Sequence, residues 1–123
     1  MNNSIKKGYI YFVNLPNNNS NVQRGKRPAL ILGVHGAIVN IIPLTTKLKR
    51  MDLIEHLLIT TIDKHNIKHN SNALLEQITT ISKDNVLNYY GTISEYDKQR
   101  INNRLNQVIK IAWQINKNDY NKK

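Results

Sequence analysis

Two nearly continuous apolar runs, separated by only two residues, constrain the fold of this 123-residue chain most strongly. The runs are residues 27–34 (RPALILGV) and 37–44 (AIVNIIPL), with His35 and Gly36 between them. A two-residue connection is typical of a tight β-hairpin, and glycine supplies the positive φ that such a turn requires. Because both runs are apolar at almost every position, we expect this hairpin to be buried on both faces.

Shorter runs predict the elements around this hairpin. Three segments rich in aromatic and β-branched residues predict strands: residues 8–15, 53–60 and 90–93. Two polar segments predict loops: residues 16–26 and 61–71. Residues 82–85 predict the start of a short helix, whereas residues 72–81 combine helix-favouring and β-branched types and leave the assignment open.

The last predicted element is a long C-terminal helix. Ser94 is a suitable N-cap, and Asp97, three residues later, can complete a capping box. Apolar residues then recur at helical spacing and form one stripe: Ile101, Leu105, Val108, Ala112 and Ile115. Short strands followed by one helix predict an α+β fold, mainly β, in which the helix packs on a small barrel or curled sheet. We expect a single domain over residues 1–123.

Charge and composition limit the partners and the compartment. The 18 Lys and Arg residues outnumber the 8 Asp and Glu residues, and the resulting net charge of +10 favours a polyanionic partner: RNA, DNA, an acidic protein or an anionic membrane surface. The chain has no cysteine, which excludes disulfides and cysteine nucleophiles and suits a reducing compartment. No stretch resembles a signal peptide or a membrane span, so we expect a cytoplasmic protein without membrane contact.

An arginine and a threonine from the ends of the hairpin form the strongest candidate site. In an antiparallel pair the start of one strand lies opposite the end of the other, so Arg27 and Thr45 become neighbours although 18 residues separate them. Pro28 fixes the backbone next to Arg27. An arginine beside a hydroxyl group is suited to bind phosphate. Lys47 and Lys49 would add positive charge around the pair.

Other chemistries find little support in the sequence. His65 and His69 have i, i+4 spacing, but they lie in a predicted loop without a carboxylate partner, so we expect no metal site. His56 lies in a predicted strand, where a packed or surface histidine is the ordinary role. The sequence also lacks phosphate-binding glycine loops, a nucleophile elbow and paired carboxylates.

Four motifs in the same order make the chain resemble the MazF/PemK family of toxins from toxin–antitoxin systems, over roughly residues 7–115. They are GYIYFVNL at residues 8–15, GKRPALI at 25–31, PLT at 43–45 and LLEQITTI at 74–81. A short helical stretch, a strand centred on Gly91 and a C-terminal helix follow in the family's order. The chain departs from many relatives at Tyr9, where they carry an acidic residue, and in its short hairpin.

The resemblance implies a fold, an activity and partners. The fold would be an SH3-like barrel with added helices, of the CcdB/MazF type, in a homodimer. The activity would be sequence-specific cleavage of single-stranded RNA without metal or another cofactor, with Arg27 and Thr45 as the catalytic pair. The loop over residues 16–26 would close over RNA, and a cognate antitoxin protein would block the same groove. Further candidates for RNA binding are Gln23, Arg24, Lys26, Thr46, Lys47, Lys49 and Gln77.

Two alternatives remain open at this stage. The first is a non-catalytic protein on the same fold, either a nucleic-acid-binding module or a gyrase poison, although the presence of both Arg27 and Thr45 argues against it. The second is a basic structural protein of a ribonucleoprotein, which gives no reason for that pair.

Overall fold

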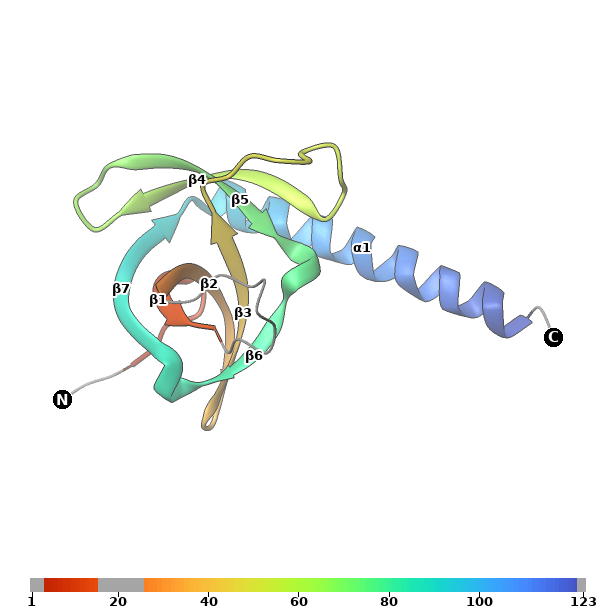
Figure 1. Cartoon of the computed structure of the whole chain (residues 1–123), viewed down its shortest axis with the longest axis horizontal. Helices are drawn as coiled ribbons and strands as arrows, with labels where there is room; N and C mark the ends of the chain where they lie inside the picture. The colour runs from red at the N-terminus through yellow and green to blue at the C-terminus, as the bar shows by residue number, and fades with distance from the viewer. Residues whose placement is uncertain (1–3, 16–25, 122–123) are drawn as a thin grey trace.

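The computed structural model describes residues 4–15 and 26–121, with side chains described up to Lys110. Within these residues seven strands precede one long helix (Figure 1). The strands are β1 (Tyr9–Asn14), β2 (Lys26–His35), β3 (Ile38–Thr45), β4 (His56–Asp63), β5 (Lys68–Leu74), β6 (Thr79–Ser82) and β7 (Val86–Ile93). Two short 3₁₀ turns, η1 (Leu75–Gln77) and η2 (Lys83–Asn85), flank β6, and the helix is α1 (Glu95–Asn121).

The strands form a single antiparallel sheet that closes on itself. The strand order is β2-β1-β7-β4-β5-β3-β6, and β2 also pairs with β3, which joins the two ends of the sheet into a ring. The strands are seen arranged in this closed ring in Figure 1. On one side β3 pairs with β2, whereas its other side pairs with β6 near the start of the strand and with β5 near its end.

The central hairpin forms as predicted, with its turn one residue further along the chain. Strands β2 and β3 run to His35 and from Ile38, so the turn consists of Gly36 and Ala37 rather than of His35 and Gly36. Gly36 has the predicted positive φ, at 61°. Burial on both faces is confirmed for two consecutive stretches, Ala29–Ile31 in β2 and Ile41–Leu44 in β3.

The prediction of a loop over residues 61–71 is wrong. These residues form the end of β4, a turn and the start of β5, which pair in register from Ile62 and Lys68 up to His56 and Leu74. The predicted strand at residues 53–60 is correspondingly displaced and begins at His56. Residues 64–70 are exposed, because the tip of this hairpin projects from the ring, and such a segment has no apolar face for a sequence pattern to reveal.

The core divides into two groups of buried side chains. One includes a residue of α1 together with strand residues, and the other combines residues of β1, β2, β3 and β6. The first group comprises Ile10, Leu30, Ile42, Leu44, Leu57, Ile59, Ala73, Leu75, Ile93 and Ile101. The second comprises Val13, Ala29, Ile31, Val39, Ile41 and Ile81. Of the predicted helix stripe, Ile101 is buried and Leu105 packs against the first group.

Helix α1 begins as predicted and fastens to the edge of β4. The Ser94 hydroxyl accepts a hydrogen bond from the Asp97 N–H at 3.0 Å. The Asp97 carboxylate does not return to Ser94, as a capping box would require, but accepts from the Thr60 N–H at 3.1 Å. One turn later Arg100 donates to the Leu58 carbonyl, and after another turn Arg104 donates to the His56 carbonyl. Helix side chains thus satisfy backbone groups along β4.

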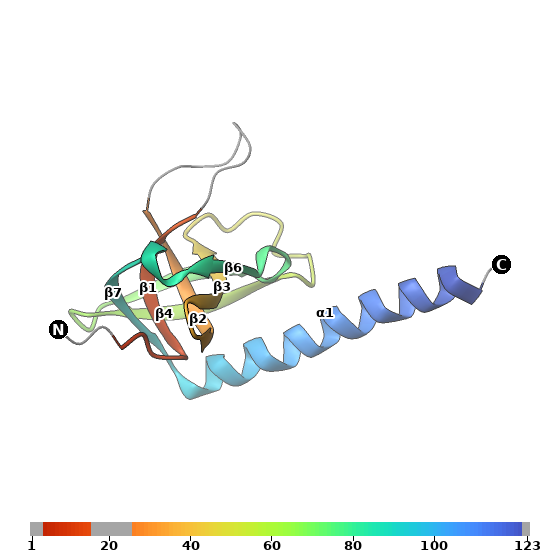
Figure 2. The same ribbon diagram turned by 90° about the horizontal axis from the view of Figure 1, so that it is seen from below.

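The helix continues well beyond the sheet, and its C-terminal half projects away from the ring in both ribbon views (Figures 1 and 2). Its contacts with the strands are made mainly at β4. The predicted α+β class, mainly β with one C-terminal helix, is confirmed.

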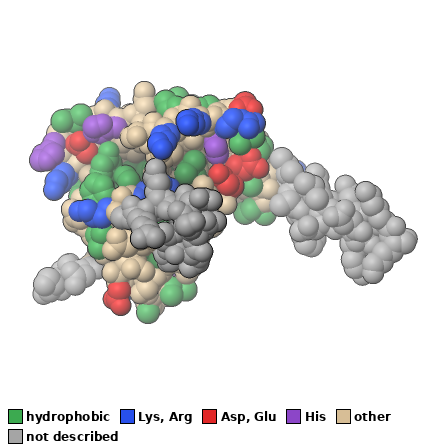
Figure 3. All heavy atoms as spheres, viewed as in Figure 1, with side chains coloured by type: hydrophobic (Ala, Val, Ile, Leu, Met, Phe, Trp, Pro, Cys, Tyr) green, Lys and Arg blue, Asp and Glu red, His purple; other side chains and the backbone are tan. Residues whose placement is uncertain are grey.

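Basic side chains are spread over the face seen in Figure 3, as the net charge of +10 leads one to expect. Histidine side chains gather at the left of this view, where the β4–β5 hairpin projects in Figure 1. No helix in residues 4–15 or 26–121 has the length and apolar character needed to span a membrane.

Candidate functional site

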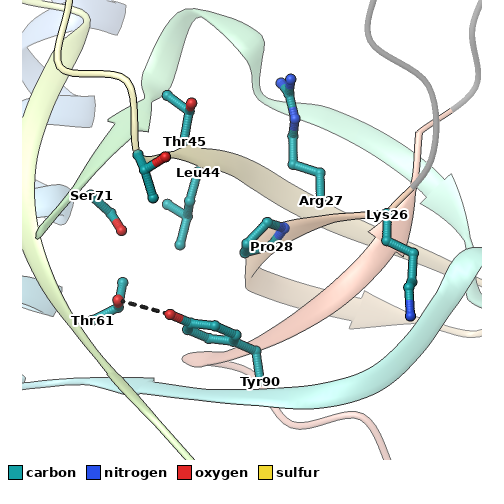
Figure 4. Close-up of a pocket in the computed structure, with 9 residues that line it drawn as sticks. Lys26, Arg27, Pro28, Leu44, Thr45, Thr61, Ser71 and Tyr90 are labelled. Carbon is teal, nitrogen blue, oxygen red and sulfur yellow. Dashed lines mark hydrogen bonds between the residues drawn. The ribbon is translucent and has the colours of Figure 1, made fainter. Parts of the chain in front are cut away.

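A cavity of about 180 Å³ opens where β2 begins and β3 ends (Figure 4). Side chains from five strands surround it, together with Thr46, which follows β3 directly. The lining residues are Lys26, Arg27, Pro28, Leu44, Thr45, Thr46, Thr61, Ser71 and Tyr90. The cavity therefore combines two cationic side chains with several hydroxyl groups.

Arg27 and Thr45 both line this cavity, as the hairpin geometry predicts. The last pair of residues between β2 and β3 is Ala29 and Pro43. Arg27 lies two residues before Ala29, and Thr45 lies two residues after Pro43, so both are at the same end of the hairpin. In Figure 4 these two residues lie on one side of Pro28 and Leu44, and Thr61 and Tyr90 lie on the other. Leu44 is buried in the core, which fixes the backbone beside Thr45.

The Thr45 hydroxyl is already oriented by the backbone. Its oxygen accepts a hydrogen bond from the Lys47 N–H at 3.2 Å. A hydroxyl group can accept and donate at the same time, so its hydrogen can be donated to a ligand in the cavity. Thr45 and Arg27 are both half-buried, which places them between the core and the solvent.

Three hydroxyl-bearing residues of the cavity were not predicted from the sequence. The Tyr90 hydroxyl lies 3.4 Å from the Thr61 hydroxyl oxygen, which itself donates to the His69 carbonyl at 3.3 Å. Thr61 and Ser71 are buried, at 1% and 5% exposure. No local motif marks these residues, because they reach the cavity only through the pairing of β4 with β5 and β7.

The remaining predicted residues divide into two groups. Lys26 and Thr46 line the cavity. Lys47 and Lys49 are exposed in the segment after β3, and Gln77 is exposed in η1; none of the three lines the cavity. Gln23 and Arg24, and most of the loop expected to close over RNA, lie outside the described residues.

With this geometry in place, a comparison with protein families decides which family the chain belongs to. Residues 6–109 match the family model described as the PemK-like, MazF-like toxin of type II toxin–antitoxin systems. The chain is a member of this toxin family. A search among curated proteins gave no match. A type II toxin has an antitoxin as its partner, so membership of this family implies a cognate antitoxin for this chain.

His56 of the toxin is held by hydrogen bonds from both ring nitrogens. Nδ1 lies 3.1 Å from the Lys49 carbonyl oxygen, and Nε2 lies 3.1 Å from Oε2 of Glu76. Desolvation alone would lower the pKa of His56, but the hydrogen bonds to Glu76 and Lys49 together raise it above its ordinary value. His56 does not line the cavity, and its bonds tie β4 to η1 and to the segment after β3.

His69 is anchored by Asp63 at the base of the β4–β5 turn. Nε2 of His69 lies 2.8 Å from Oδ2 of Asp63, and Oδ1 accepts from the His65 and Ile67 N–H groups. The hydrogen bond from His69 and those from the backbone lower the pKa of Asp63 to about 2. Within the described residues no three His, Asp or Glu side chains gather as a set of metal ligands.

Proposed function

We propose that this toxin is an endoribonuclease that cuts single-stranded RNA at the cavity lined by Arg27 and Thr45. One observation carries the proposal: a guanidinium and a hydroxyl, 18 residues apart in the sequence, line one small cavity beside the cationic Lys26. Phosphate is the ligand that such a set of donors suits best. The net charge of +10 supports a nucleic acid as the source of that phosphate.

The proposed reaction uses the 2′-hydroxyl of the RNA as the nucleophile. The 2′-oxygen attacks the adjacent phosphorus while its proton passes to a base. The bond from phosphorus to the 5′-oxygen of the next nucleotide breaks, and that oxygen takes up a proton. The products are a 2′,3′-cyclic phosphate and a 5′-hydroxyl end. No metal ion or cofactor takes part in this scheme.

In this scheme Arg27 binds the scissile phosphate and stabilises the charge that develops on its oxygens. A guanidinium remains charged and offers several donors in one plane, so it can contact two phosphate oxygens at once. Thr45 donates its hydroxyl hydrogen to a non-bridging oxygen, as donors in an oxyanion hole do. Lys26 and Thr46 contact neighbouring phosphates, and Gln23, Arg24, Lys47, Lys49 and Gln77 extend the RNA-binding surface.

We also propose that the toxin acts as a cytoplasmic homodimer that its antitoxin inactivates by covering the cavity. Small domains with short, strongly apolar strands commonly bury further surface by symmetric pairing. Light scattering at micromolar concentration is expected to give twice the mass of the chain, and a monomer would contradict the dimer.

The test of the proposed reaction is a map of the RNA ends. The purified toxin is incubated with a mixed single-stranded RNA in EDTA, and the products are sequenced and tested for their end groups. The proposal requires cleavage at short recurring sequences, with cyclic phosphate and 5′-hydroxyl ends. Stable binding of RNA without cleavage would instead support a non-catalytic binding protein on the same fold.

A further inference from the structure

Two aromatic rings lie against a third ring that lines the cavity. Tyr90, which lines the cavity, contacts Phe12 of β1 edge to face, with ring centroids 5.4 Å apart and an interplanar angle of 89°. His69 of β5 lies with its ring centroid 6.4 Å from that of Tyr90, and the planes of the two rings make an angle of 50°. Three strands distant in sequence thus supply one cluster of rings. The proposed catalysis uses none of them.

The His69 ring is exposed and held in place. Its side chain is 41% exposed, and its Nε2 is tied to the Asp63 carboxylate at 2.8 Å. That carboxylate is itself fixed by two backbone N–H groups of the same turn. A ring whose orientation is fixed before binding loses little conformational entropy when a planar ligand stacks on it.

The Phe12 ring is covered on one side by a movable cation. The ammonium of Lys26 lies 5.6 Å from the centroid of the half-buried Phe12 ring, and the Lys26 side chain is exposed. An exposed cation–π contact stabilises less than a nucleobase stacked on an aromatic ring, so a base can displace Lys26. The displaced ammonium remains beside the cavity, where it can bind a phosphate.

We propose that Phe12 and His69, whose rings both lie against Tyr90, stack the bases of nucleotides that flank the phosphate held by Arg27 and Thr45. The inference rests on the proposed function, since it takes single-stranded RNA as the ligand. It assigns to these rings the selection of unpaired RNA, because bases within a duplex stack on one another and cannot reach a protein ring.

The test separates the contribution of the bases from that of the phosphates. Two fluorescein-labelled RNA octamers are compared, octauridine and the same ribose-phosphate chain without bases, in EDTA and with Thr45→Val toxin to suppress cleavage. Both carry the same charge, so the ratio of their dissociation constants measures what the bases contribute to binding. For Thr45→Val toxin without any ring substitution, which is the parent in this test, we expect octauridine to bind about ten times more tightly, or more, than the chain without bases.

Variants of the rings assign this ratio to individual residues. Phe12→Leu and His69→Ala are each expected to lower the ratio several-fold, whereas His69→Phe, which keeps a ring but loses the hydrogen bond to Asp63, is expected to retain more of the ratio than His69→Ala. Tyr96→Leu is the matched control, because it removes a 72% exposed ring from α1, outside the cavity. If Phe12→Leu fails to fold, the two His69 variants, whose ring lies on the surface, carry the test.

A ratio near one in the parent, or an equal ratio in parent and ring variants, would overturn the inference. Cleavage by the unsubstituted toxin is measured separately. If the toxin cleaves RNA but its ring variants leave the ratio unchanged, only the stacking inference fails. If the ratio depends on the rings and no RNA is cut, the stacking surface stands and the proposed cleavage fails.

Discussion

Among the described glycines, Gly91 occupies the position at which the fold tolerates an added side chain least. It lies in β7, opposite Ile10 of β1 and Asp63 of β4. A Cβ atom at this position would collide with the Ile62 carbonyl oxygen, which belongs to the backbone of β4. The close approach of β4 and β7, on which closure of the ring depends, therefore requires a glycine here.

Gly91→Ala is expected to lower the free energy of unfolding by about 3 kcal/mol or more, because two backbones must move apart. Urea unfolding followed by circular dichroism measures this. Gly36→Ala is the matched control: its Cβ meets nothing within 4 Å, and only its φ of 61° is unfavourable, so a cost of about 1–2 kcal/mol is expected. Equal costs for the two variants would contradict the packing argument.

The residues of the cavity differ in how far the sequence alone predicts them. Arg27 and Thr45 were predictable because a two-residue turn fixes which ends of β2 and β3 meet. Thr61, Ser71 and Tyr90 were not, since their positions depend on pairings between distant strands that no local pattern encodes. The aromatic contact between Phe12 and Tyr90 depends on the pairing of β1 with β7 in the same way.

Among the elements, α1 acts as a cover for one edge of β4. The helix advances about 5 Å per turn and a strand about 6.8 Å per two residues, so side chains on successive helix turns can reach alternate residues of the strand. Asp97, Arg100 and Arg104 form hydrogen bonds with backbone groups of β4 from Thr60 back to His56. The sequence predicted the helix and its cap, but the capping-box pattern concealed that Asp97 has a different partner.

Asp97→Ala is expected to destabilise the fold by about 1–3 kcal/mol, because it leaves the Thr60 N–H without its acceptor and Arg100 without its 2.8 Å ion pair. Glu95→Ala serves as the control, since it removes an ion pair whose carboxylate is 89% exposed, and it is expected to cost under about 0.5 kcal/mol. Thermal unfolding of both variants under one buffer condition makes the comparison. An Asp97→Ala variant as stable as Glu95→Ala would refute the role assigned to this edge.

The β4–β5 hairpin shows why a sequence pattern can fail to predict a strand. Apart from Ile67, its exposed residues around the turn are polar on both faces, and burial begins only at Ser71 on the returning strand. Alternation between apolar and polar residues arises when one face of a strand contacts a core. Here the hairpin extends beyond that core, so the same polar composition that indicates a loop also suits a projecting pair of strands.

At the scale of the whole molecule, two ion pairs contribute to how stability varies with pH. The pKa of His56 is raised in the folded toxin, so its contribution is complete below about pH 6.5 and is lost as the pH rises through the folded-state value. The pKa of Asp63 is lowered to about 2, so its contribution is present above about pH 4 and is lost as the pH falls toward 2.

Glu76→Gln is expected to remove most of the His56 effect, because it takes away the carboxylate partner of Nε2. Urea unfolding at pH 6 and pH 8 should therefore show a larger stability difference between parent and variant at pH 6. The control Glu95→Gln, whose carboxylate is exposed, should show no such dependence. A difference that grew toward pH 8 would contradict the assigned sign.

The charge of the whole chain predicts steep salt dependence for RNA binding. With +10 net charge, binding through several phosphates releases an equal number of counterions. For single strands the logarithm of affinity should fall with the logarithm of salt concentration at a slope of about −0.7 per phosphate contact. Anisotropy titrations from 50 to 300 mM salt measure it. A flat dependence would show that the charge serves another partner.

The most direct test of the account is RNA cleavage in EDTA by Arg27→Ala, Thr45→Val and the double variant, each shown by circular dichroism and melting to be folded like the parent. Thr45→Val keeps the shape of the side chain and removes only its hydroxyl. Lys83→Ala and Thr79→Val, which change exposed residues away from the cavity, serve as controls.

The account predicts that each single variant loses about 100-fold or more in cleavage rate, while both controls retain the parental rate. The double variant should lose little beyond the worse single variant, because groups that act on one transition state are not additive. Folded Arg27→Ala and Thr45→Val toxins that both cleave RNA at the parental rate would contradict the assignment of this cavity as the active site.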